Sequence, residues 1–223
     1  MARKSPEDPG RAADVDIRRG ACPQRNAVVT RSGSPLGRVC VFCGSNEGAR
    51  SAYVEAAVEL AGRLLARRID LVYGGGRVGL MGRIADVVLA GGGVVHGVIP
   101  RDLFRREVVH DGLTELVVAD SMLERKALMM DRSDAFVVLP GGYGTLDELF
   151  EALTWSQLGI HAKPVGVLDV AGYFDPLLAF LDHQVREGFV HAAHRQLLVV
   201  DTVADTLLDR LDAAAATFAQ ARS

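Results

Sequence analysis

Short apolar segments that alternate with helix-like segments are the feature that most restricts the fold of this chain. The clearest is Ala135 to Leu139, which contains no polar residue. A strand without a polar face must be covered on both sides, and such strands belong to parallel sheets flanked by helices. Pro140 ends this strand because it has no N–H group for the sheet. A helical pattern begins a few residues later.

The same alternation extends over most of the chain. Parallel strands are joined by right-handed crossovers through helices, so the pattern predicts an α/β fold. We expect one open, doubly wound, mostly parallel sheet of about seven strands, of the Rossmann-like type. The other expected strands are 38–42, 70–73, 94–99, 115–118, 165–168 and 197–200, and the expected helices are 51–67, 80–90, 121–133, 145–157, 176–187 and 202–218.

The chain is long enough for one domain. Its 223 residues include a first stretch, 1–37, that is rich in Arg, Pro, Gly, Ser and Ala and has no sustained periodicity. Such composition is typical of disorder. We therefore predict a disordered tail over 1–37 and a single Rossmann-like domain over 38–218.

Bulk properties exclude several classes of protein. The net charge of −3 gives no reason to expect a nucleic-acid partner. No apolar run is long enough to span a membrane, and no secretory signal is recognisable. We therefore expect a cytoplasmic protein with no membrane partner.

The cysteines and histidines do not predict a metal site. Cys40-x-x-Cys43 has the spacing of a redox motif, but it lies within and at the end of a strand, where residues three apart point to opposite faces. We interpret both thiols as structural. The six histidines show no ligand spacing, and we expect neither a metal nor a cofactor.

Three glycine-containing turns follow predicted strands, at 44–45, 74–79 and 141–145. In doubly wound sheets, ligands bind beyond the carboxyl ends of the strands. The three turns should therefore converge on one ligand site that includes Ser45. A strand, the glycine turn and the start of a helix make a phosphate the first candidate ligand at 141–145.

The turn at 74–79 matches the dinucleotide fingerprint Gly-x-Gly-x-x-Gly. The acidic residue that NAD binding needs is missing, because the next strand ends in Pro100-Arg101. Contacts from Gly75 and Gly76 to a phosphate or ribose are the more plausible hypothesis. Neither glycine loop continues into Gly-Lys-Ser/Thr, which argues against P-loop nucleotide hydrolysis.

Two interpretations remain open for Thr145 and Glu148. The glycines before them can let an anion approach the backbone, and Glu148 would place a carboxylate beside it. Alternatively, Thr145-x-x-Glu148 is a capping box, which needs no substrate.

Two charged clusters also admit two interpretations. Arg125-Lys126 lies early in a predicted helix, where the helix dipole disfavours cations. An anionic ligand would offset that cost, although a solvated pair is the simpler alternative. Arg105-Arg106-Glu107 lies on a predicted loop between strands, where functional sites are common. The alternative interpretation is a run of charged residues exposed to solvent.

The motifs together resemble the LOG ("Lonely guy") family, the cytokinin riboside 5′-monophosphate phosphoribohydrolases, which are also labelled lysine decarboxylase-like. The resemblance covers roughly 39–211. It rests on Pro140-Gly141-Gly142-Tyr143-Gly144-Thr145-Leu146-Asp147-Glu148 and on Met122-Leu123-Glu124-Arg125-Lys126-Ala127-Leu128-Met129. Leu123 departs from the pattern, since the family usually has His there, and the departure concerns recognition of the base.

The resemblance implies hydrolysis of the N-glycosidic bond of cytokinin riboside 5′-monophosphates or AMP, giving free base and ribose 5-phosphate. It also implies a homodimer. A nucleotide-binding carrier or sensor is the alternative. By the resemblance, Arg125 and Glu148 are catalytic, and the nucleotide site is lined by Glu107, Lys126, Gly141, Gly142, Tyr143, Gly144, Thr145 and Thr154.

Overall fold

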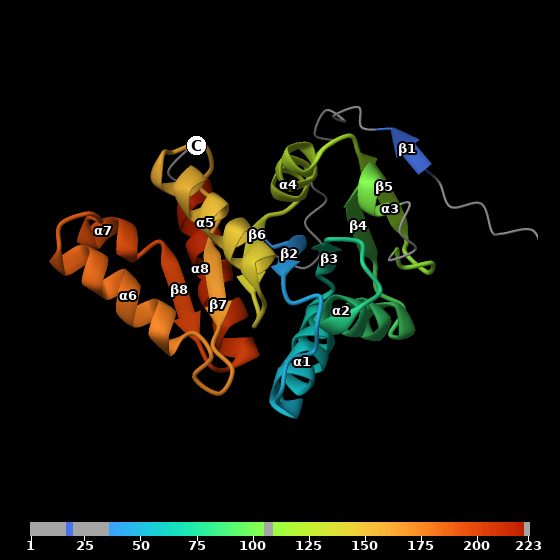
Figure 1. Ribbon diagram of the computed structural model, residues 1–223, viewed down its shortest axis with the longest axis horizontal. Coiled ribbons are helices and arrows are strands. Elements are labelled where there is room, and N and C mark those ends of the chain that lie inside the picture. Colours follow the sequence, from blue (N-terminus) through green and yellow to red (C-terminus); the bar gives the residue numbers. More distant parts are fainter. Residues whose placement is uncertain (1–16, 20–35, 105–108, 221–223) are drawn as a thin grey trace, which may run out of the picture.

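The computed structural model describes residues 17–19, 36–104 and 109–220. These residues form an α/β fold with one sheet, which confirms the predicted fold class (Figure 1). The strands are β1 (Ile17–Arg19), β2 (Arg38–Phe42), β3 (Asp70–Tyr73), β4 (Val95–Pro100), β5 (Glu115–Ala119), β6 (Ala135–Val138), β7 (Val165–Leu168) and β8 (Leu198–Asp201). The helices are α1 (Ser51–Arg67), α2 (Gly79–Ala90), α3 (Arg101–Phe104), α4 (Met122–Asp131), α5 (Tyr143–Gln157), α6 (Asp175–Arg186), α7 (Ala192–Arg195) and α8 (Ala204–Gln220).

The strands lie in the order β1-β5-β4-β3-β2-β6-β7-β8, and every pairing is parallel. The seven predicted strands are β2 to β8. β1 was not predicted, and it pairs with β5 at the edge of the sheet. The predicted disorder of the remaining tail falls on residues outside those described, apart from Leu36 and Gly37 just before β2.

Strand order reverses at β2. The chain moves outward from β2 through β3 and β4 to β5, then returns to place β6 on the other side of β2. This reversal is the topological switch point, beyond which ligands bind in folds of this kind. The turns after β2 and β6 therefore lie where a ligand site is expected.

The core has two layers because strand side chains alternate between the faces of the sheet. One face packs against α1, α2 and α8 and contains Val39 and Val41. The other packs against α4, α5 and α6 and contains Cys40 and Phe42. Cys43 belongs to the first layer and Cys40 to the second, and both are free and buried, which agrees with a structural role.

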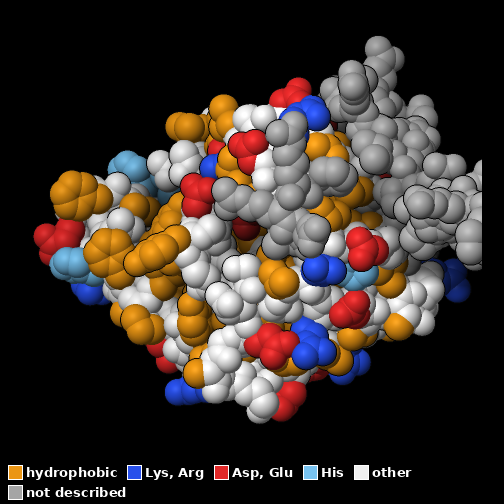
Figure 2. Space-filling model, turned by 45° about the vertical axis from the view of Figure 1, so that its right-hand side comes forward, with side chains coloured by type: hydrophobic (Ala, Val, Ile, Leu, Met, Phe, Trp, Pro, Cys, Tyr) orange, Lys and Arg blue, Asp and Glu red, His pale blue; other side chains and the backbone are white. Residues whose placement is uncertain are grey.

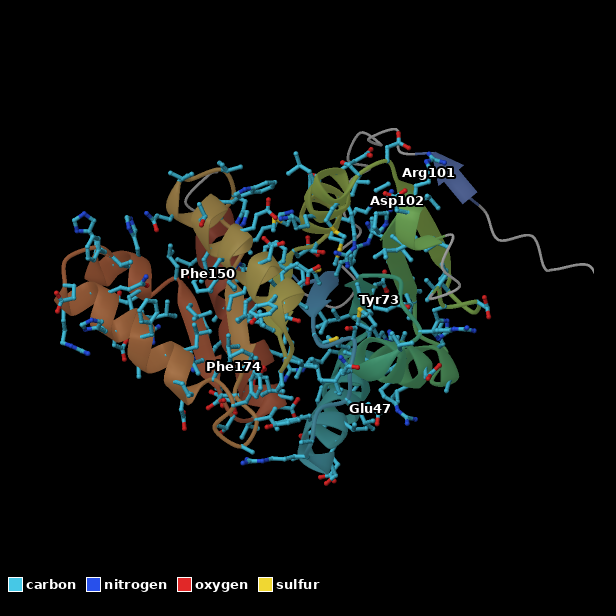
Figure 3. All side chains as sticks on the ribbon, in the orientation of Figure 1. Glu47, Tyr73, Arg101, Asp102, Phe150 and Phe174 are labelled. Carbon is cyan, nitrogen blue, oxygen red and sulfur yellow. The ribbon has the colours of Figure 1, made fainter. Side chains whose placement is uncertain are left out.

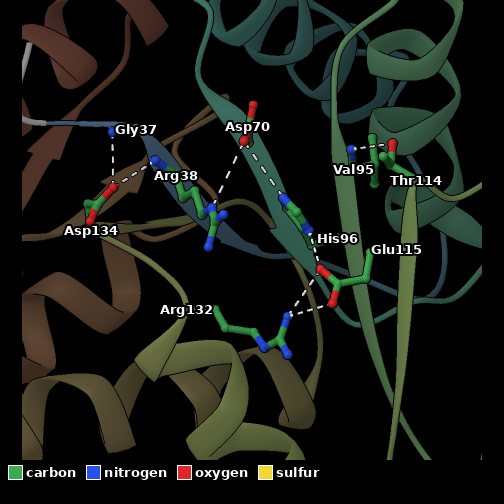
Figure 4. Close-up of polar contacts among 9 residues, drawn as sticks. All are labelled: Gly37, Arg38, Asp70, Val95, His96, Thr114, Glu115, Arg132 and Asp134. Atoms are coloured by element: carbon green, nitrogen blue, oxygen red, sulfur yellow. Dashed lines mark hydrogen bonds and ion pairs between the residues drawn. The ribbon is translucent and has the colours of Figure 1, made fainter. Parts of the chain in front are cut away.

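Side chains at the amino ends of the strands form a separate ionic network (Figure 4). His96 Nδ1 lies 2.8 Å from Glu115 Oε2, and Arg132 Nη1 lies 3.1 Å from Glu115 Oε1. His96 Nε2 and Arg38 Nε approach Asp70 Oδ2 at 3.7 and 3.9 Å. We name these five residues the amino-edge network. It ties β2, β3, β4 and β5 to the end of α4, at the edge opposite to the glycine turns.

The described helices include none that is both long and apolar enough to cross a membrane.

Candidate active site

The three glycine turns meet at the carboxyl edge of the sheet. The Gly44 N–H donates a hydrogen bond to Pro140 O, and Gly44 O accepts one from the Leu80 N–H, both at 3.0 Å. The turn after β2 is therefore tied to the turn after β6 and to the first turn of α2. Their predicted convergence is confirmed.

Two glycines are required by this close packing. Gly79 has φ +59°, and a Cβ at that position would collide with the backbone of Ser45 and Asn46. A Cβ at Gly141 would collide with the Thr145 side chain and press on the backbone of Gly44. The turns can approach one another only because these side chains are absent.

The amino terminus of α5 lies at the surface, and its first N–H groups have no partner within the helix. The helix begins at Tyr143 with Gly142 as its N-cap and has no capping side chain. The first helical hydrogen bond of α5 is donated by the Leu146 N–H to Gly142 O, at 3.1 Å. Gly142, Tyr143 and Gly144 are exposed. Such a terminus favours an anion through its N–H groups and its dipole.

The capping-box interpretation of Thr145 and Glu148 is wrong. Thr145 is the third residue of α5 and not its N-cap, and its side chain is buried. Glu148 is buried as well and directs its carboxylate at Arg125. The N-cap is instead Gly142, which has an extended backbone and no side chain that could cap the helix.

Arg125 and Glu148 form a buried ion pair between α4 and α5. Arg125 Nη1 lies 2.8 Å from Glu148 Oε1, with side chains 12% and 10% exposed. Arg125 Nε donates to Val98 O at 3.1 Å, which anchors the guanidinium to the end of β4. Gly74 lies directly beneath it, where a Cβ would collide with the guanidinium. The pair is thus held in one geometry by three elements.

Burial raises the pKa of the Glu148 carboxyl above its ordinary value, and the Arg125 guanidinium counteracts part of that rise. The site therefore combines a desolvated carboxylate with a fixed cation. Electrostatic interactions are stronger in such surroundings than in water.

Lys126 faces the other way, into a second ionic contact between the same helices. Its Nζ lies 3.0 Å from Asp147 Oδ2 and 2.7 Å from Glu151 Oε2. Desolvation lowers the pKa of this ammonium, but the two carboxylates outweigh it and raise the pKa overall. Lys126 is thus already neutralised by protein carboxylates.

Apart from Lys126, described above, the predicted site residues divide into three groups. The first surrounds the start of α5 and comprises Ser45, Arg125, Gly141, Gly142, Tyr143, Gly144, Thr145 and Glu148. The second is not brought to that surface: Gly75 and Gly76 are buried against β4, β5 and residues 109–110, and Thr154 is exposed farther along α5. Glu107 lies outside the described residues.

Sequence reasoning missed several residues that shape the site. Gly74 packs against Arg125 and belongs to the predicted glycine turn 74–79, for which the sequence-based prediction names Gly75 and Gly76 as the contacts. Asp147 and Glu151 gave a signal, since both lie within one turn of Glu148 on the predicted helix. Tyr173, whose hydroxyl donates to Gly141 O, gave none, because it is 32 residues away.

Comparison with known proteins identifies the family. Residues 81–211 match the family model described as "Possible lysine decarboxylase". The chain is 56% identical over 175 residues to the rice protein "Probable cytokinin riboside 5′-monophosphate phosphoribohydrolase LOGL9" (Oryza sativa subsp. japonica), covering 78% of this chain and 77% of that protein. The chain belongs to the LOG family. A LOG protein of Arabidopsis thaliana, "Cytokinin riboside 5′-monophosphate phosphoribohydrolase LOG4", is 50% identical over 183 residues, covering 82% of this chain and 85% of its own.

Solved structures with the same fold are more distant from this LOG-family chain. A molybdenum cofactor binding protein from Rippkaea orientalis has a TM-score of 0.61 and 20% identity, covering 79% of this chain and 95% of its own. The Moco carrier protein from Chlamydomonas reinhardtii has a TM-score of 0.61 and 19% identity, covering 81% and 98%. These similarities establish the fold alone.

Proposed function

We propose that this protein hydrolyses the N-glycosidic bond of cytokinin riboside 5′-monophosphates and of AMP, releasing the free base and ribose 5-phosphate. The observation that carries the proposal is the buried Arg125–Glu148 pair beside the open amino terminus of α5. Plain phosphate binding needs the helix terminus but has no use for a desolvated carboxylate. Family membership supports the same activity.

The 5′-phosphate binds the N–H groups of Gly142 to Thr145. A dianion there is stabilised by the helix dipole and by direct hydrogen bonds. The ribose then extends toward Glu148, which is one turn farther along α5. This order places C1′ of the ribose near the carboxylate and the base beyond it, toward Met122, whose Sδ lies 3.6 Å from Arg125 Nη1.

Glu148 acts on the sugar. The C1′–N bond breaks with its electrons moving to the base, and the ribose passes through an oxocarbenium-like state. The Glu148 carboxylate stabilises that positive charge and positions the water whose oxygen attacks C1′. One proton of this water ends on the departing base. Arg125 orients the carboxylate and the ribose hydroxyl groups.

The decarboxylase description of the family model can be judged from the lysines. A pyridoxal phosphate enzyme needs a lysine amine that forms a Schiff base. Lys126 is bound to Asp147 and Glu151, and Lys163 Nζ donates to Met130 O at 2.6 Å. The carboxylates raise the pKa of Lys126, which opposes Schiff-base formation. These contacts argue against decarboxylase chemistry at Lys126 and Lys163.

Incubation with isopentenyladenosine 5′-monophosphate and with AMP tests the proposal, with free base and ribose 5-phosphate measured by chromatography. We expect release of base from the wild type and loss of release in Arg125→Ala and Glu148→Gln. Tight binding of both nucleotides without release would identify the carrier alternative. Near-normal hydrolysis by either variant would refute the assignment of the pair.

We also propose that the protein is a homodimer formed through the α4–α7 side. Hydrophobic side chains gather on the left flank of the molecule in Figure 2, the side where α5 to α7 lie in Figure 1. Among the described residues, the large exposed hydrophobic side chains that lie with α1, α2 and α8 are Val58, Val78 and Val203. Those that lie with α4 to α7 are Met122, Leu123, Tyr143, Phe150, Leu158, Ile160, Tyr173, Phe180 and Phe189.

The outer face of α5 fits such an interface. Tyr143, Phe150, Thr154 and Leu158 follow one another at helical spacing and are all exposed, and Figure 3 shows Phe150 on this helix. Thr154, predicted to line the nucleotide site, lies on this face. Its proximity to a nucleotide therefore depends on the partner copy.

A further inference from the structure

The loop between β7 and α6 is held in a specific conformation. The buried carboxylate of Asp169 accepts a hydrogen bond from the Phe174 N–H at 2.8 Å. Arg50 Nη1 donates to Ala171 O at 3.2 Å. Ala171 itself has φ +53°, which costs free energy in a residue with a Cβ. Surrounding contacts thus maintain a strained backbone at this position.

The loop presents Tyr173 to the turn after β6. The Tyr173 hydroxyl donates a hydrogen bond of 2.5 Å to Gly141 O. Its ring packs edge-on against Tyr53, with centroids 5.6 Å apart, and against Phe174, at 4.9 Å. Figure 3 shows Phe174 where the loop enters α6. The aromatic contacts hold the ring in the position from which its hydroxyl reaches Gly141 O.

The acceptor of this bond determines where an adjacent donor points. Gly141 O belongs to the peptide unit that also contains the Gly142 N–H. In a planar trans peptide the carbonyl and the N–H point in opposite directions. Holding the Gly141 carbonyl on the Tyr173 side therefore turns the Gly142 N–H away from Tyr173. The preceding carbonyl, Pro140 O, is held in the same way by the Gly44 N–H.

We propose that Tyr173 is a positioning residue for nucleotide binding, which acts by aiming the Gly142 N–H at the 5′-phosphate. The inference rests on the proposed function for the identity of the ligand. Tyr173 does not need to touch the nucleotide, because its effect passes through the Gly141–Gly142 peptide. Without the Tyr173 hydroxyl, the Gly141–Gly142 peptide can rotate. The Gly142 N–H then points away from the phosphate for part of the time.

The test compares Tyr173→Phe with Tyr53→Phe. Each variant removes one hydroxyl from the same aromatic cluster, but only the Tyr173 hydroxyl bonds to Gly141. Binding of AMP and of adenosine is measured by calorimetry in the Glu148→Gln background, so that no turnover is needed. Steady-state hydrolysis of isopentenyladenosine 5′-monophosphate is measured in the unmodified background, together with the melting temperature.

We expect Tyr173→Phe to weaken AMP binding about fivefold, the size of one neutral hydrogen bond. Adenosine binding should stay within about twofold, because adenosine has no phosphate. KM should rise by a similar factor while kcat changes little, and Tyr53→Phe should match the wild type in every measurement.

Unchanged AMP binding in Tyr173→Phe would overturn the inference. An equal loss of AMP and adenosine binding, or an equal effect of Tyr53→Phe, would show a role in folding alone and would overturn it too. If the wild type binds AMP without hydrolysing it, the proposed hydrolase activity fails, yet the ratio of AMP to adenosine binding still decides the role of Tyr173.

Discussion

Glu148 is the residue whose protonation state should limit activity. Burial raises its pKa, so the carboxylate forms at a higher pH than in an ordinary glutamate. Under the proposed mechanism, hydrolysis needs this carboxylate and is therefore lost as the pH falls through the raised pKa. We expect the acid limb of the pH profile of kcat/KM above pH ~4.3, the ordinary value for Glu.

The Glu148→Gln variant keeps the shape of the side chain and removes its charge. We expect kcat to fall by about 10²-fold or more, as for loss of a catalytic acid or base. Any residual activity should lack the acid limb. A limb that persists unchanged in the variant would assign that titration to another group.

We expect a substitution of Gly74 to lower kcat/KM, although Gly74 itself does not touch the substrate. In Gly74→Ala, the new methyl group meets the Arg125 guanidinium and displaces it from Glu148. Displacement by about 1 Å can lower a rate by about 10²-fold, and we expect a loss of kcat/KM of at least tenfold. The matched control is Gly62→Ala on α1, where a Cβ meets nothing within 4 Å. This control should retain activity and gain about 0.5–1 kcal/mol of stability.

At the scale of elements, α4 and α5 are joined by three ion pairs, one made by Arg125 and two by Lys126, and the two cations have different roles. Arg125 belongs to the proposed reaction, whereas Lys126 is saturated by Asp147 and Glu151. We infer that Lys126 braces the helices and so keeps Arg125 opposite Glu148. This differs from its sequence-based prediction as a nucleotide ligand, and the difference can be tested.

Lys126→Met leaves the largely buried Glu151 carboxylate unpaired. We expect a loss of about 3 kcal/mol of unfolding free energy, the low end of the cost of such a charge. Adding Glu151→Met should restore most of the stability, as measured by denaturant titration. If Lys126 acts only by bracing the helices, any rise in KM for the nucleotide in Lys126→Met should be reversed in the double variant. If stability recovers and KM does not, Lys126 binds the nucleotide directly.

Strands and long helices could be predicted because their signals are local. The apolar runs gave β2 to β8, and the predicted helix at 51–67 coincides with α1. β1 was missed because its sequence, Ile-Arg-Arg, contains no apolar run, and α3 and α7 were missed because four residues cannot show helical periodicity. Glycine at the N-cap of α5 was missed because Thr145 offered a better local cap, and tertiary contacts with Arg125 outweighed it.

The proposed catalytic pair could be selected from the sequence, but its surroundings could not. Arg125 and Glu148 each appeared in a recognisable motif. Their burial, the support of the guanidinium by Val98 O and the hydroxyl of Tyr173 depend on contacts between distant segments. No local pattern encodes such contacts, since they depend on which segments the sheet topology brings side by side.

At the scale of the whole molecule, assembly can be tested on the exposed face of α5. Phe150→Asp places a charge on the proposed interface, so we expect sedimentation to show half the mass of the wild type. Val58→Asp is the control, because Val58 is similarly exposed on α1, on the opposite layer. It should leave the mass unchanged. A wild type that sediments as a monomer, or a Phe150→Asp protein that remains dimeric, would contradict an interface on this face.

The amino-edge network has a consequence for how this protein can be altered. It fastens one end of the sheet (Figure 4), while the glycine turns and the Arg125–Glu148 ion pair occupy the other end. The ionic contacts of this network are thereby separated from Arg125 and Glu148 by the length of the strands. Resistance to heat and choice of substrate can therefore be selected independently, in different libraries, and the gains combined without one eroding the other.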